Sequence, residues 1–375
     1  MKTAQTQAEI IVAGHICLDV IPTFEGHTGN LSSLLIPGKL VNVGKVILST
    51  GGCVANTGLA LHRLGIPTRL MGKVGADQFG ESILDILRQQ DEALANGMIV
   101  DPDSETSYSI VISPPGIDRI FFHNPGANDT FQASDIRFEQ LRGARYFHFG
   151  YPPLMQRMYT HHGSEIADLL EHVKATGLTT SLDLAQPDPE TASGKINWLR
   201  WLTTVLPQVD IFLPSFDEIL YMLDRSQFEA DRQDCLNPDQ LAYLADKLLE
   251  MGAAIVVFKL GDKGLYLKST SDLARLEAMG AGQPADLKAW QGITAYTPCF
   301  KCDVVGTTGA GDCTIAGFLA AISKDLSPKD VMTYAVAVGG FNVESADATS
   351  GVPSWDIVKT RIQKGWEKQS PTFQV

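Results

Sequence analysis

The sequence lacks any cluster of basic residues and any long apolar segment. Its 375 residues include 30 Lys and Arg against 43 Asp and Glu, a formal net charge of −13. Affinity for nucleic acid or for an anionic membrane surface depends on clustered Lys and Arg, so we expect neither as a partner. Residues 1–22 contain only a short, interrupted apolar run, which fits neither a secretory signal nor a membrane span. An anionic ligand must therefore be held locally, by backbone dipoles, a metal ion or a few selected cations.

Cysteine is also scarce. Six cysteines are scattered through the chain, which is typical of reduced thiols rather than of a disulfide framework, and we expect a cytoplasmic protein. Cys299 and Cys302 form a C-x-x-C pair, a spacing found in metal and redox sites. No second such pair completes a zinc set, so we interpret the two cysteines as part of a strand over 295–305.

The chain does contain a regular alternation of apolar runs and helical periodicity. Apolar runs bounded by glycine or proline, such as 9–21, 68–75, 144–150 and 253–261, are typical of buried strands. Segments with apolar residues at helical spacing follow many of these runs, including 54–65 and 77–90. This order predicts an α/β protein with three α/β/α layers and a mainly parallel central sheet. Ligands in such folds bind beyond the carboxyl ends of the strands.

One segment departs from this alternation. Residues 106–124 form two β-rich runs around a Pro-Pro-Gly turn, with no helix between them, which predicts an antiparallel hairpin and a candidate lid. Two polar stretches, 224–238 and 270–292, are interpreted as surface insertions. We find no repeat and no linker that would divide the chain, so residues 1–375 are expected to form a single domain.

The strongest chemical signal is the stretch GTTGAGDCTIAGF. Gly309, Ala310 and Gly311 let a ligand approach the backbone, and a helix dipole favours an anion at this position. The helix expected over 311–323 is apolar nearly all round, so its amino end should lie in a site shielded from water. The amides of 309–311 would then stabilise a transferred phosphoryl group, and Asp312 would accept the proton of an attacking hydroxyl. A loop capped by Asp312, with no ligand, explains the same residues.

A second set of small and polar residues lies near the amino end. Asp19 ends the first expected strand. Gly51, Gly52 and Asn56 stand at the start of the helix expected over 54–65. Asp and Asn at such positions are suited to hydrogen-bonding sugar hydroxyls, and glycines let a ligand press against the backbone. Each residue also has a plain structural interpretation, as a turn or a solvated strand end.

Together these segments resemble the ribokinase family, also called the PfkB carbohydrate kinases. The resemblance covers nearly the whole chain in order. It is carried by GGCVANTGLALHRLG, TTGAGDCTIAGF, GHICLD, NPGAN, LPSFDE, FKLGDKG and SADATSGVPS. It implies an ATP- and Mg²⁺-dependent kinase of a small alcohol-bearing substrate. It also implies a ribokinase-like fold, with a small β lid formed mainly by 106–124 and partly near 20–48. Lid hairpins in the family often pair between subunits, which predicts a homodimer through the lid.

The resemblance also implies roles for individual positions. Asp312 resembles the catalytic base, 309–311 the anion hole, and Glu218 the carboxylate that organises Mg²⁺ through water. The positions that match substrate contacts are Asp19, Gly51, Gly52, Asn56 and Arg119. The positions that match nucleotide contacts are Lys259, Gly261, Gly264, Thr308 and Asn342. For Arg119, a solvated charge on the hairpin is an equally good interpretation.

Three positions depart from the family pattern. Gly306 stands where relatives usually carry an aspartate that helps bind an activating monovalent cation. We therefore expect potassium dependence to be weak or absent, unless Asp303 takes over that role. Ser215 replaces a usual asparagine, which alters the magnesium and phosphate network. Cys53 stands where the ribokinase branch often has lysine, which disfavours a phosphorylated sugar as substrate.

The leading prediction is transfer of the γ-phosphoryl group of ATP to an unphosphorylated sugar or sugar acid. A nucleoside kinase of the same fold is the first alternative, because Phe121 and Phe122 on the hairpin are available to stack on a base or simply to pack the lid. The second alternative is a ligand-binding or regulatory homologue with impaired turnover, suggested by Gly306 and Ser215. Retention of Asp312 argues against that alternative.

Overall fold

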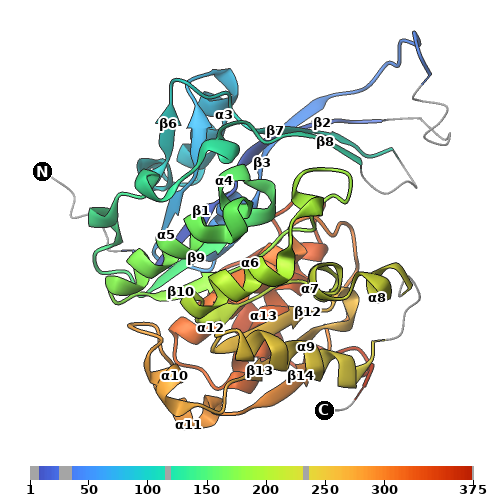
Figure 1. The fold of residues 1–375 in the computed structure, drawn as a ribbon. Coiled ribbons are helices and arrows are strands. Elements are labelled where there is room, and N and C mark those ends of the chain that lie inside the picture. Colours follow the sequence, from blue (N-terminus) through green and yellow to red (C-terminus); the bar gives the residue numbers. More distant parts are fainter. Residues whose placement is uncertain (1–7, 25–35, 115–119, 231–235, 374–375) are drawn as a thin grey trace, which may run out of the picture.

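The computed structural model describes residues 8–24, 36–114, 120–230 and 236–373. Its centre is an eight-stranded sheet in the order β14-β13-β12-β11-β10-β9-β1-β4 (Figure 1). The parallel strands are β4 (Thr68–Met71), β1 (Ile10–Gly14), β9 (Tyr146–Gly150), β10 (Thr179–Leu182), β11 (Ile211–Phe212) and β12 (Ile255–Lys259). The antiparallel edge consists of β13 (Leu265–Ser269) and β14 (Thr294–Thr297). The predicted α/β class with a mainly parallel sheet is confirmed.

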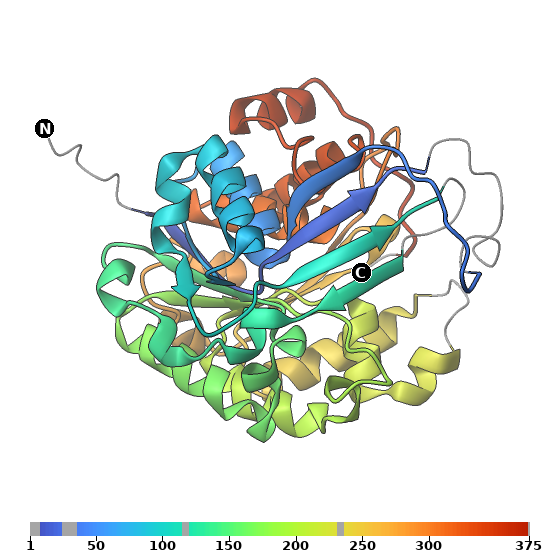
Figure 2. The same ribbon diagram turned by 90° about the horizontal axis from the view of Figure 1, so that it is seen from above.

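Helices cover both faces of this sheet, which gives three layers (Figure 2). One face is packed by α2 (Cys53–Arg63), α3 (Gln78–Gln90), α12 (Ala310–Ser323), α13 (Pro328–Val343) and α14 (Trp355–Gln363). The other face is packed by α4 (Gln156–Tyr159), α5 (Ser164–Ala175), α6 (Trp198–Val205), α7 (Phe216–Leu223) and α9 (Pro238–Glu250). Strand β1 serves both cores, because Ile10 and Val12 point to one face while Ile11 and Ala13 point to the other. Its apolar run is therefore uninterrupted.

Short helices connect these elements. The short α-helices are α8 (Arg225–Ala230), α10 (Leu273–Glu277) and α11 (Leu287–Trp290). The 3₁₀ helices are η1 (Glu92–Gly97), η2 (Gly126–Thr130), η3 (Ala133–Asp135), η4 (Phe138–Leu141), η5 (Pro152–Leu154), η6 (His161–Gly163), η7 (Ser193–Lys195), η8 (Leu206–Gln208) and η9 (Gly261–Lys263). Helix starts follow local chemistry: Asp77 caps α3, because its side chain accepts a hydrogen bond from the Gly80 amide at 2.8 Å.

Two expected strands are each divided in the structure. Residues 9–21 form β1 and β2 (Cys17–Pro22), which belong to different sheets. The break follows Gly14, whose φ is +122° and where an added Cβ would lie 2.3 Å from the Gly150 carbonyl oxygen. The run 68–75 likewise forms β4 and β5 (Lys73–Gly75), and β5 pairs with β6 (Ile99–Asp101) in a small separate sheet. The prediction of single strands is wrong at both places, because apolar periodicity does not record a change of sheet.

A four-stranded outer sheet extends away from the layered body, in the order β3-β2-β7-β8 (Figure 1). Strands β7 (Tyr108–Ile112) and β8 (Ile120–Asn124) pair antiparallel, which confirms the hairpin expected over 106–124. Strands β2 and β3 (Val46–Gly51) pair antiparallel beside it, overlapping both ends of the contribution expected near 20–48. Arg119 lies outside the described residues.

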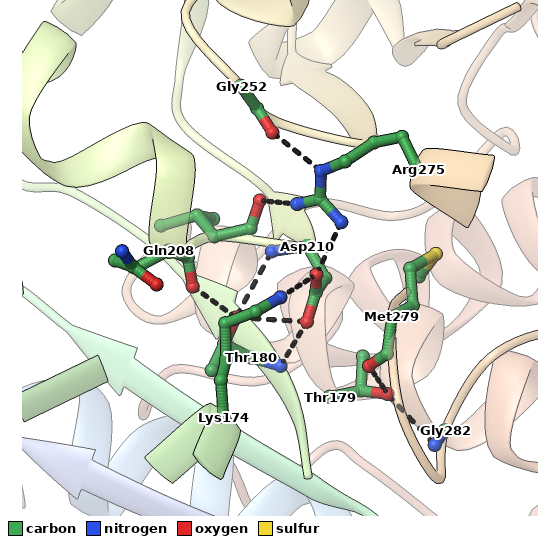
Figure 3. Close-up of polar contacts among 10 residues, drawn as sticks. Lys174, Thr179, Thr180, Gln208, Asp210, Gly252, Arg275, Met279 and Gly282 are labelled. Carbon is green, nitrogen blue, oxygen red and sulfur yellow. Dashed lines mark hydrogen bonds and ion pairs between the residues drawn. The ribbon is translucent and has the colours of Figure 1, made fainter. Parts of the chain in front are cut away.

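The amino end of the parallel sheet is closed by a buried ionic cluster around Asp210 (Figure 3). Asp210 is 0 % exposed and directly precedes β11. Its carboxylate accepts hydrogen bonds from Lys174 Nζ at 2.5 Å and Arg275 Nη1 at 2.8 Å. The backbone amide of Thr180 donates to it at 2.8 Å. Two cations and an amide therefore satisfy this carboxylate, which ties α5, α10 and β11 together.

The segment 270–292 is more than a surface insertion. It contains α10 and α11, and Arg275 from α10 reaches into the Asp210 cluster. Three of its side chains are almost fully buried: Leu276, Met279 and Trp290. The interpretation of 270–292 as a surface insertion is wrong at these buried residues. Glycine and proline around them suggested a surface segment, but the apolar side chains pack into the core. The other segment, 224–238, contains α8 and is only partly described.

Candidate active site

The candidate site forms where the amino end of α12 meets the carboxyl ends of β9, β10 and β12. The helix expected over 311–323 is confirmed and begins one residue earlier, at Ala310. Gly309 caps it with φ of +71°, and an added Cβ there would lie 2.4 Å from the Ala348 carbonyl oxygen. Only glycine allows this turn, which brings the first helical amides and Asp312 to the interior of the protein.

Asp312 is buried among neutral hydrogen-bond donors. Its side chain is 3 % exposed. Asn56 Nδ2 donates to it at 2.9 Å, and the Tyr151 hydroxyl lies 2.9 and 2.8 Å from its two oxygens. The Thr57 hydroxyl lies at 3.4 Å. Burial raises the pKa of Asp312, while the bond from Asn56 and the charge of Lys259 oppose that shift. The result is a carboxylate with increased basicity, which suits proton abstraction.

A buried ion pair lies next to this carboxylate. Lys259 Nζ is 2.5 Å from Asp183 Oδ1, and the two side chains are 10 % and 1 % exposed. Burial raises the pKa of Asp183, and Lys259 opposes the shift. Burial lowers the pKa of Lys259, but Asp183 and Glu218 raise it by more, so the ammonium stays charged. Lys259 is also close to α12, since an added Cβ on Gly311 would lie 3.8 Å from its Nζ.

Glu218 is the third acidic group of this region. Its Oε2 accepts a hydrogen bond from the Ser215 amide at 2.8 Å, which completes a capping box at the start of α7. Burial raises the pKa of Glu218, and Lys259 opposes the shift. Ser215 therefore has a structural role that its sequence position did not reveal, while Glu218 also faces the site.

Two cavities meet at this point. The first has a volume of about 350 Å³ and the second about 270 Å³. The residues that line both are Ser215, Lys259, Thr307, Ala310 and Gly311. Three acidic residues line the second cavity and not the first: Asp183, Glu218 and Asp312. One cavity is therefore bounded by acidic groups, and the other is walled by glycine and apolar residues.

The expected nucleotide residues are only partly brought together. Lys259, Gly261 and Gly264 line the first cavity. Thr308 and Asn342 line neither cavity. Asn342 is fully buried and donates from Nδ2 to the Thr308 carbonyl oxygen at 2.8 Å, which supports the loop before α12 from behind. The predicted contact of these two residues with a nucleotide therefore stays a prediction.

The C-x-x-C pair lines the first cavity but does not lie in a strand. Strand β14 ends at Thr297, before Pro298, which has no amide hydrogen for the ladder. The expected strand over 295–305 is therefore wrong beyond its first residues. Burial raises the pKa values of Cys299 and Cys302 to about 11, so both thiols stay protonated near neutral pH.

The expected substrate residues form a cluster at the root of the outer sheet. An added Cβ on Gly51 would lie 2.5 Å from Asp19 Oδ2, and one on Gly52 would lie 2.6 Å from His15 Nδ1. Cys17 Sγ donates to Asp19 at 3.5 Å. Burial raises the pKa of Asp19 to about 6. The two glycines therefore allow acidic and imidazole side chains to pack directly on the backbone.

Asn56 and His15 connect this cluster to Asp312. Asn56 follows the glycine pair in the first turn of α2 and hydrogen-bonds the Asp312 carboxylate. The ring of His15 lies 6.0 Å from that of Tyr151, centre to centre, and its Nε2 is 3.3 Å from Nε2 of His123 on β8. The cluster around Asp19 is thus connected to the surroundings of Asp312, although Asp19, Gly51 and Gly52 line neither cavity.

The departures from the family pattern have clear surroundings. An added Cβ on Gly306 would lie 3.0 Å from the Ser345 carbonyl oxygen and 3.2 Å from that of Ala346. Carbonyl oxygens therefore face the Gly306 position, and Asp303 is exposed nearby in sequence. Cys53 is fully buried, and its thiol donates to the Ala13 carbonyl oxygen at 3.7 Å, away from both cavities.

Sequence reasoning missed three residues that shape the site. Tyr151 and Thr57 contact Asp312, and Asp183 pairs with Lys259. Tyr151 and Asp183 directly follow the carboxyl ends of β9 and β10. The rule that ligands bind beyond those ends was the available signal, but it was applied only to Asp19.

In the described part of the chain, no group of three or more His, Cys, Asp or Glu side chains is arranged to hold a metal ion. Within those same residues, no helix has both the length and the apolar character needed to cross a membrane.

Comparison with known proteins agrees with this geometry. The model of the pfkB family carbohydrate kinases matches residues 7–355. Fructokinase-2 of Zea mays is 25 % identical over 369 residues, which cover 95 % of this chain and 94 % of that protein.

Two solved structures share the fold. Arabidopsis thaliana ribokinase, complexed with ribose and ATP, has a TM-score of 0.70 and 18 % identity, covering 95 % of this chain and 98 % of that chain. A putative ribokinase II from E. coli, in complex with ATP and Mg²⁺, has a TM-score of 0.69 and 20 % identity, covering 95 % and 99 %. The ribokinase-like fold is thereby confirmed. Because the family model spans most of the sequence, the chain belongs to the pfkB family of carbohydrate kinases.

Proposed function

We propose that this enzyme transfers the γ-phosphoryl group of ATP to a hydroxyl of a small unphosphorylated sugar or sugar acid. One observation carries the proposal. Asp312 lines the second cavity but not the first, and it lies beside the junction where both cavities are lined by Lys259, Ala310 and Gly311. A nucleotide in the first cavity and an alcohol in the second would meet at this junction, with a buried carboxylate on the alcohol side.

The first cavity suits the nucleotide. Backbone can approach a ligand closely at its glycines, which are Gly261, Gly264, Gly339 and Gly340. Apolar side chains that would cover a base are Leu265, Phe300 and Val336. The cavity ends at the amino terminus of α12, where the helix dipole favours phosphate.

Mg²⁺ suits the junction as an ion held mainly by phosphate and water, which is its usual preference. Asp183 and Glu218 are buried, line the second cavity and are the carboxylates that would orient the waters of the ion. When bound, Mg²⁺ neutralises charge on the phosphate oxygens. We retain the prediction that dependence on potassium is weak or absent unless Asp303 takes over the role, because Gly306 supplies no carboxylate.

In the proposed reaction the substrate oxygen bonds to the γ-phosphorus, the bond from that phosphorus to the bridging oxygen breaks, and ADP leaves. The hydroxyl proton passes to Asp312, whose raised pKa favours its acceptance. The amides of 309–311 and the Lys259 ammonium would stabilise the transferred group. The Ala310 amide would exchange a long bond to the Thr307 carbonyl oxygen, at 3.3 Å, for one to phosphate.

The acceptor is proposed to be a small unphosphorylated sugar or sugar acid. Its hydroxyls would meet Asn56 and the cluster of Asp19, Gly51 and Gly52, with Arg119 kept as a proposed contact. The relatives named above support fructose and ribose as the first compounds to test. A nucleoside is the second candidate, favoured by Phe121 and Phe122, which are 51 % and 52 % exposed on β8. Neighbouring strand residues face opposite sides, so only one of the two can stack on a base.

We further propose that 1–375 acts as one kinase domain, with the outer sheet as its lid and as the surface of a homodimer. The outer sheet carries exposed apolar side chains: Val46, Ile47, Leu48, Ile110, Phe121 and Phe122. Among the described residues, the edge strands β3 and β8 each pair on one side only. An apolar patch on such a sheet is typical of a subunit interface. A cytoplasmic location is proposed on the free thiols of Cys17, Cys53 and Cys313.

A substrate panel tests the proposed function. The protein is incubated with ATP, Mg²⁺ and fructose, ribose, sugar acids or nucleosides, and ADP and phosphorylated product are measured. A thermal-shift screen with a non-hydrolysable ATP analogue reports binding separately. We expect a sugar or sugar acid to raise the melting temperature and to be phosphorylated. Phosphorylation of nucleosides alone would select the second candidate, and binding without any transfer would select the regulatory homologue.

A further inference from the structure

The residue that follows β9 has a strained backbone. Tyr151 has φ of 65° and ψ of 38°, in the left-handed region. A bulky side chain rarely adopts this conformation outside functional or tightly constrained sites. The conformation reverses the chain at the carboxyl end of β9, between Gly150 and the start of η5 at Pro152. Tyr151 also lines the second cavity.

The phenol of Tyr151 bridges the two oxygens of Asp312. Its oxygen lies 2.9 Å from Oδ1 and 2.8 Å from Oδ2, so one O–H group is shared between them. Asn56 donates to Oδ2 and Thr57 approaches Oδ1. A donor shared between both oxygens restricts the rotation of the carboxylate about its Cβ–Cγ bond, and it adds to the longer contact from Thr57 and the bond from Asn56.

The phenol acts as a donor and does not act as the base. Burial and the negative charges of Asp312 and Asp183 raise the pKa of Tyr151 well above its usual value. The phenolic proton therefore stays on the tyrosine oxygen. Its hydrogen bond lowers the pKa of Asp312 and so opposes the effect of burial on that carboxylate.

We propose that Tyr151 is a positioning residue whose hydroxyl holds the Asp312 carboxylate in one orientation and stabilises its ionised form by hydrogen bonding. The proposal rests on the function assigned to Asp312 above. During transfer the substrate O–H bond breaks and its proton goes to Asp312, while the Tyr151 proton remains in place. The strained backbone is the cost of bringing a long aromatic donor to this carboxylate from the end of β9.

Tyr151→Phe tests the proposal, because it removes one oxygen and leaves the ring. Tyr146→Phe is the matched control: Tyr146 is buried on the same strand, lines neither cavity, and donates to the Gly282 carbonyl oxygen at 2.8 Å. We expect Tyr151→Phe to lower kcat/KM by about 10- to 100-fold. We expect the acidic limb of its pH profile to move upward by about one unit. Tyr146→Phe should leave both unchanged.

A measurement without turnover separates this proposal from the kinase assignment. In protein labelled with ¹³C at the aspartate carboxyl carbons, Asp312→Asn identifies the Asp312 resonance. We expect that resonance to titrate at higher pH in Tyr151→Phe than in the wild type and in Tyr146→Phe. An unchanged titration in a folded variant overturns the proposal, whether or not any sugar is phosphorylated.

A second variant covers the case in which Tyr151→Phe does not fold. Tyr151→Asn tolerates the left-handed backbone, and its shorter amide does not reach the carboxylate as the phenol does. We expect the same upward shift of the Asp312 titration. If Asp312 titrates as in the wild type, the proposal is wrong.

Discussion

Asp210 and Asp312 are both buried carboxylates of the same three-layer body, yet they belong to opposite ends of its parallel sheet. Asp210 is 0 % exposed and is paired with Lys174 and Arg275. Asp312 is 3 % exposed and accepts hydrogen bonds from neutral groups. Two cations compensate the charge of Asp210, so that loss of the carboxylate would leave buried charges unpaired. Burial raises the pKa of Asp312 beside a cavity, although its neutral donors oppose that shift, and a raised pKa is the condition a base needs.

The surroundings of the two ends differ in the same way. At the amino end, Arg275 from the segment 270–292 closes the cluster around Asp210, as Figure 3 shows. At the carboxyl end, two cavities converge on Lys259 and α12. Burial of charge alone therefore does not identify a functional site. Two features separate the two carboxylates: Asp210 is paired with cations, whereas Asp312 has neutral hydrogen-bond donors and lines a cavity.

The largest expected effect on stability comes from breaking the amino-end cluster. Asp210→Asn leaves Lys174 and Arg275 without their carboxylate, so we expect the free energy of unfolding to fall by about 3 kcal/mol. Urea denaturation measures this change. The kcat of the protein that remains folded should match the wild type. A loss of turnover without a loss of stability would show that the two ends do not differ as described.

The next largest effect is expected at the junction of the cavities. Lys259→Met removes the ammonium beside Gly311, and we expect kcat to fall by about 100-fold. Lys174→Met is the matched control, since it removes a partly buried lysine that also pairs with an aspartate, at 2.5 Å. That control should lose stability and keep kcat. Steady-state kinetics of the two variants measure this difference. Equal kcat values in Lys259→Met and Lys174→Met would contradict the proposal that Lys259 stabilises the transferred phosphoryl group.

A smaller effect is expected at Asp19, with a sign that depends on pH. Burial raises the pKa of Asp19 to about 6 in the folded protein, above its value in an unfolded chain. The folded state therefore favours the protonated form, and its stability falls as pH rises through about 6. Asp19→Asn should gain about 1 to 2 kcal/mol at pH 8, allowing for partial exposure, and nothing at pH 4. Thermal melts at both pH values measure this, and the same variant should bind sugar less tightly.

The smallest effect is expected for potassium. The carbonyl oxygens of Ser345 and Ala346 face Gly306. Glycine adds no carboxylate beside them, so a cation bound there would lack a charged ligand. Turnover should be nearly the same in matched potassium, sodium and choline salts. Strong stimulation by potassium would show that another group, such as Asp303, completes a cation site.

Much of the fold follows from local patterns in the sequence. The hairpin over 106–124 and the helix after Gly309 were predicted because turn residues and apolar periodicity act over short distances. The break between β1 and β2 was not predicted, because it depends on the approach of Gly14 to Gly150, more than a hundred residues away in sequence.

The site was predictable to a similar depth. Asp312 and Asn56 stand in motifs, and the structure brings them together at 2.9 Å. Tyr151 and Asp183 stand in no motif, and their positions follow only from the parallel register of β9 and β10. The order of strands in a sheet is a long-range property, so these residues could be assigned only once the sheet was known.

The most direct test of the account is single-turnover phosphoryl transfer by Asp312→Asn, with ATP and an accepted sugar both saturating. The account predicts that transfer slows by about 10²- to 10⁴-fold while both ligands bind almost as tightly as they do to the wild type. Transfer near the wild-type rate in this variant would contradict it, because the proton of the hydroxyl would then have another acceptor.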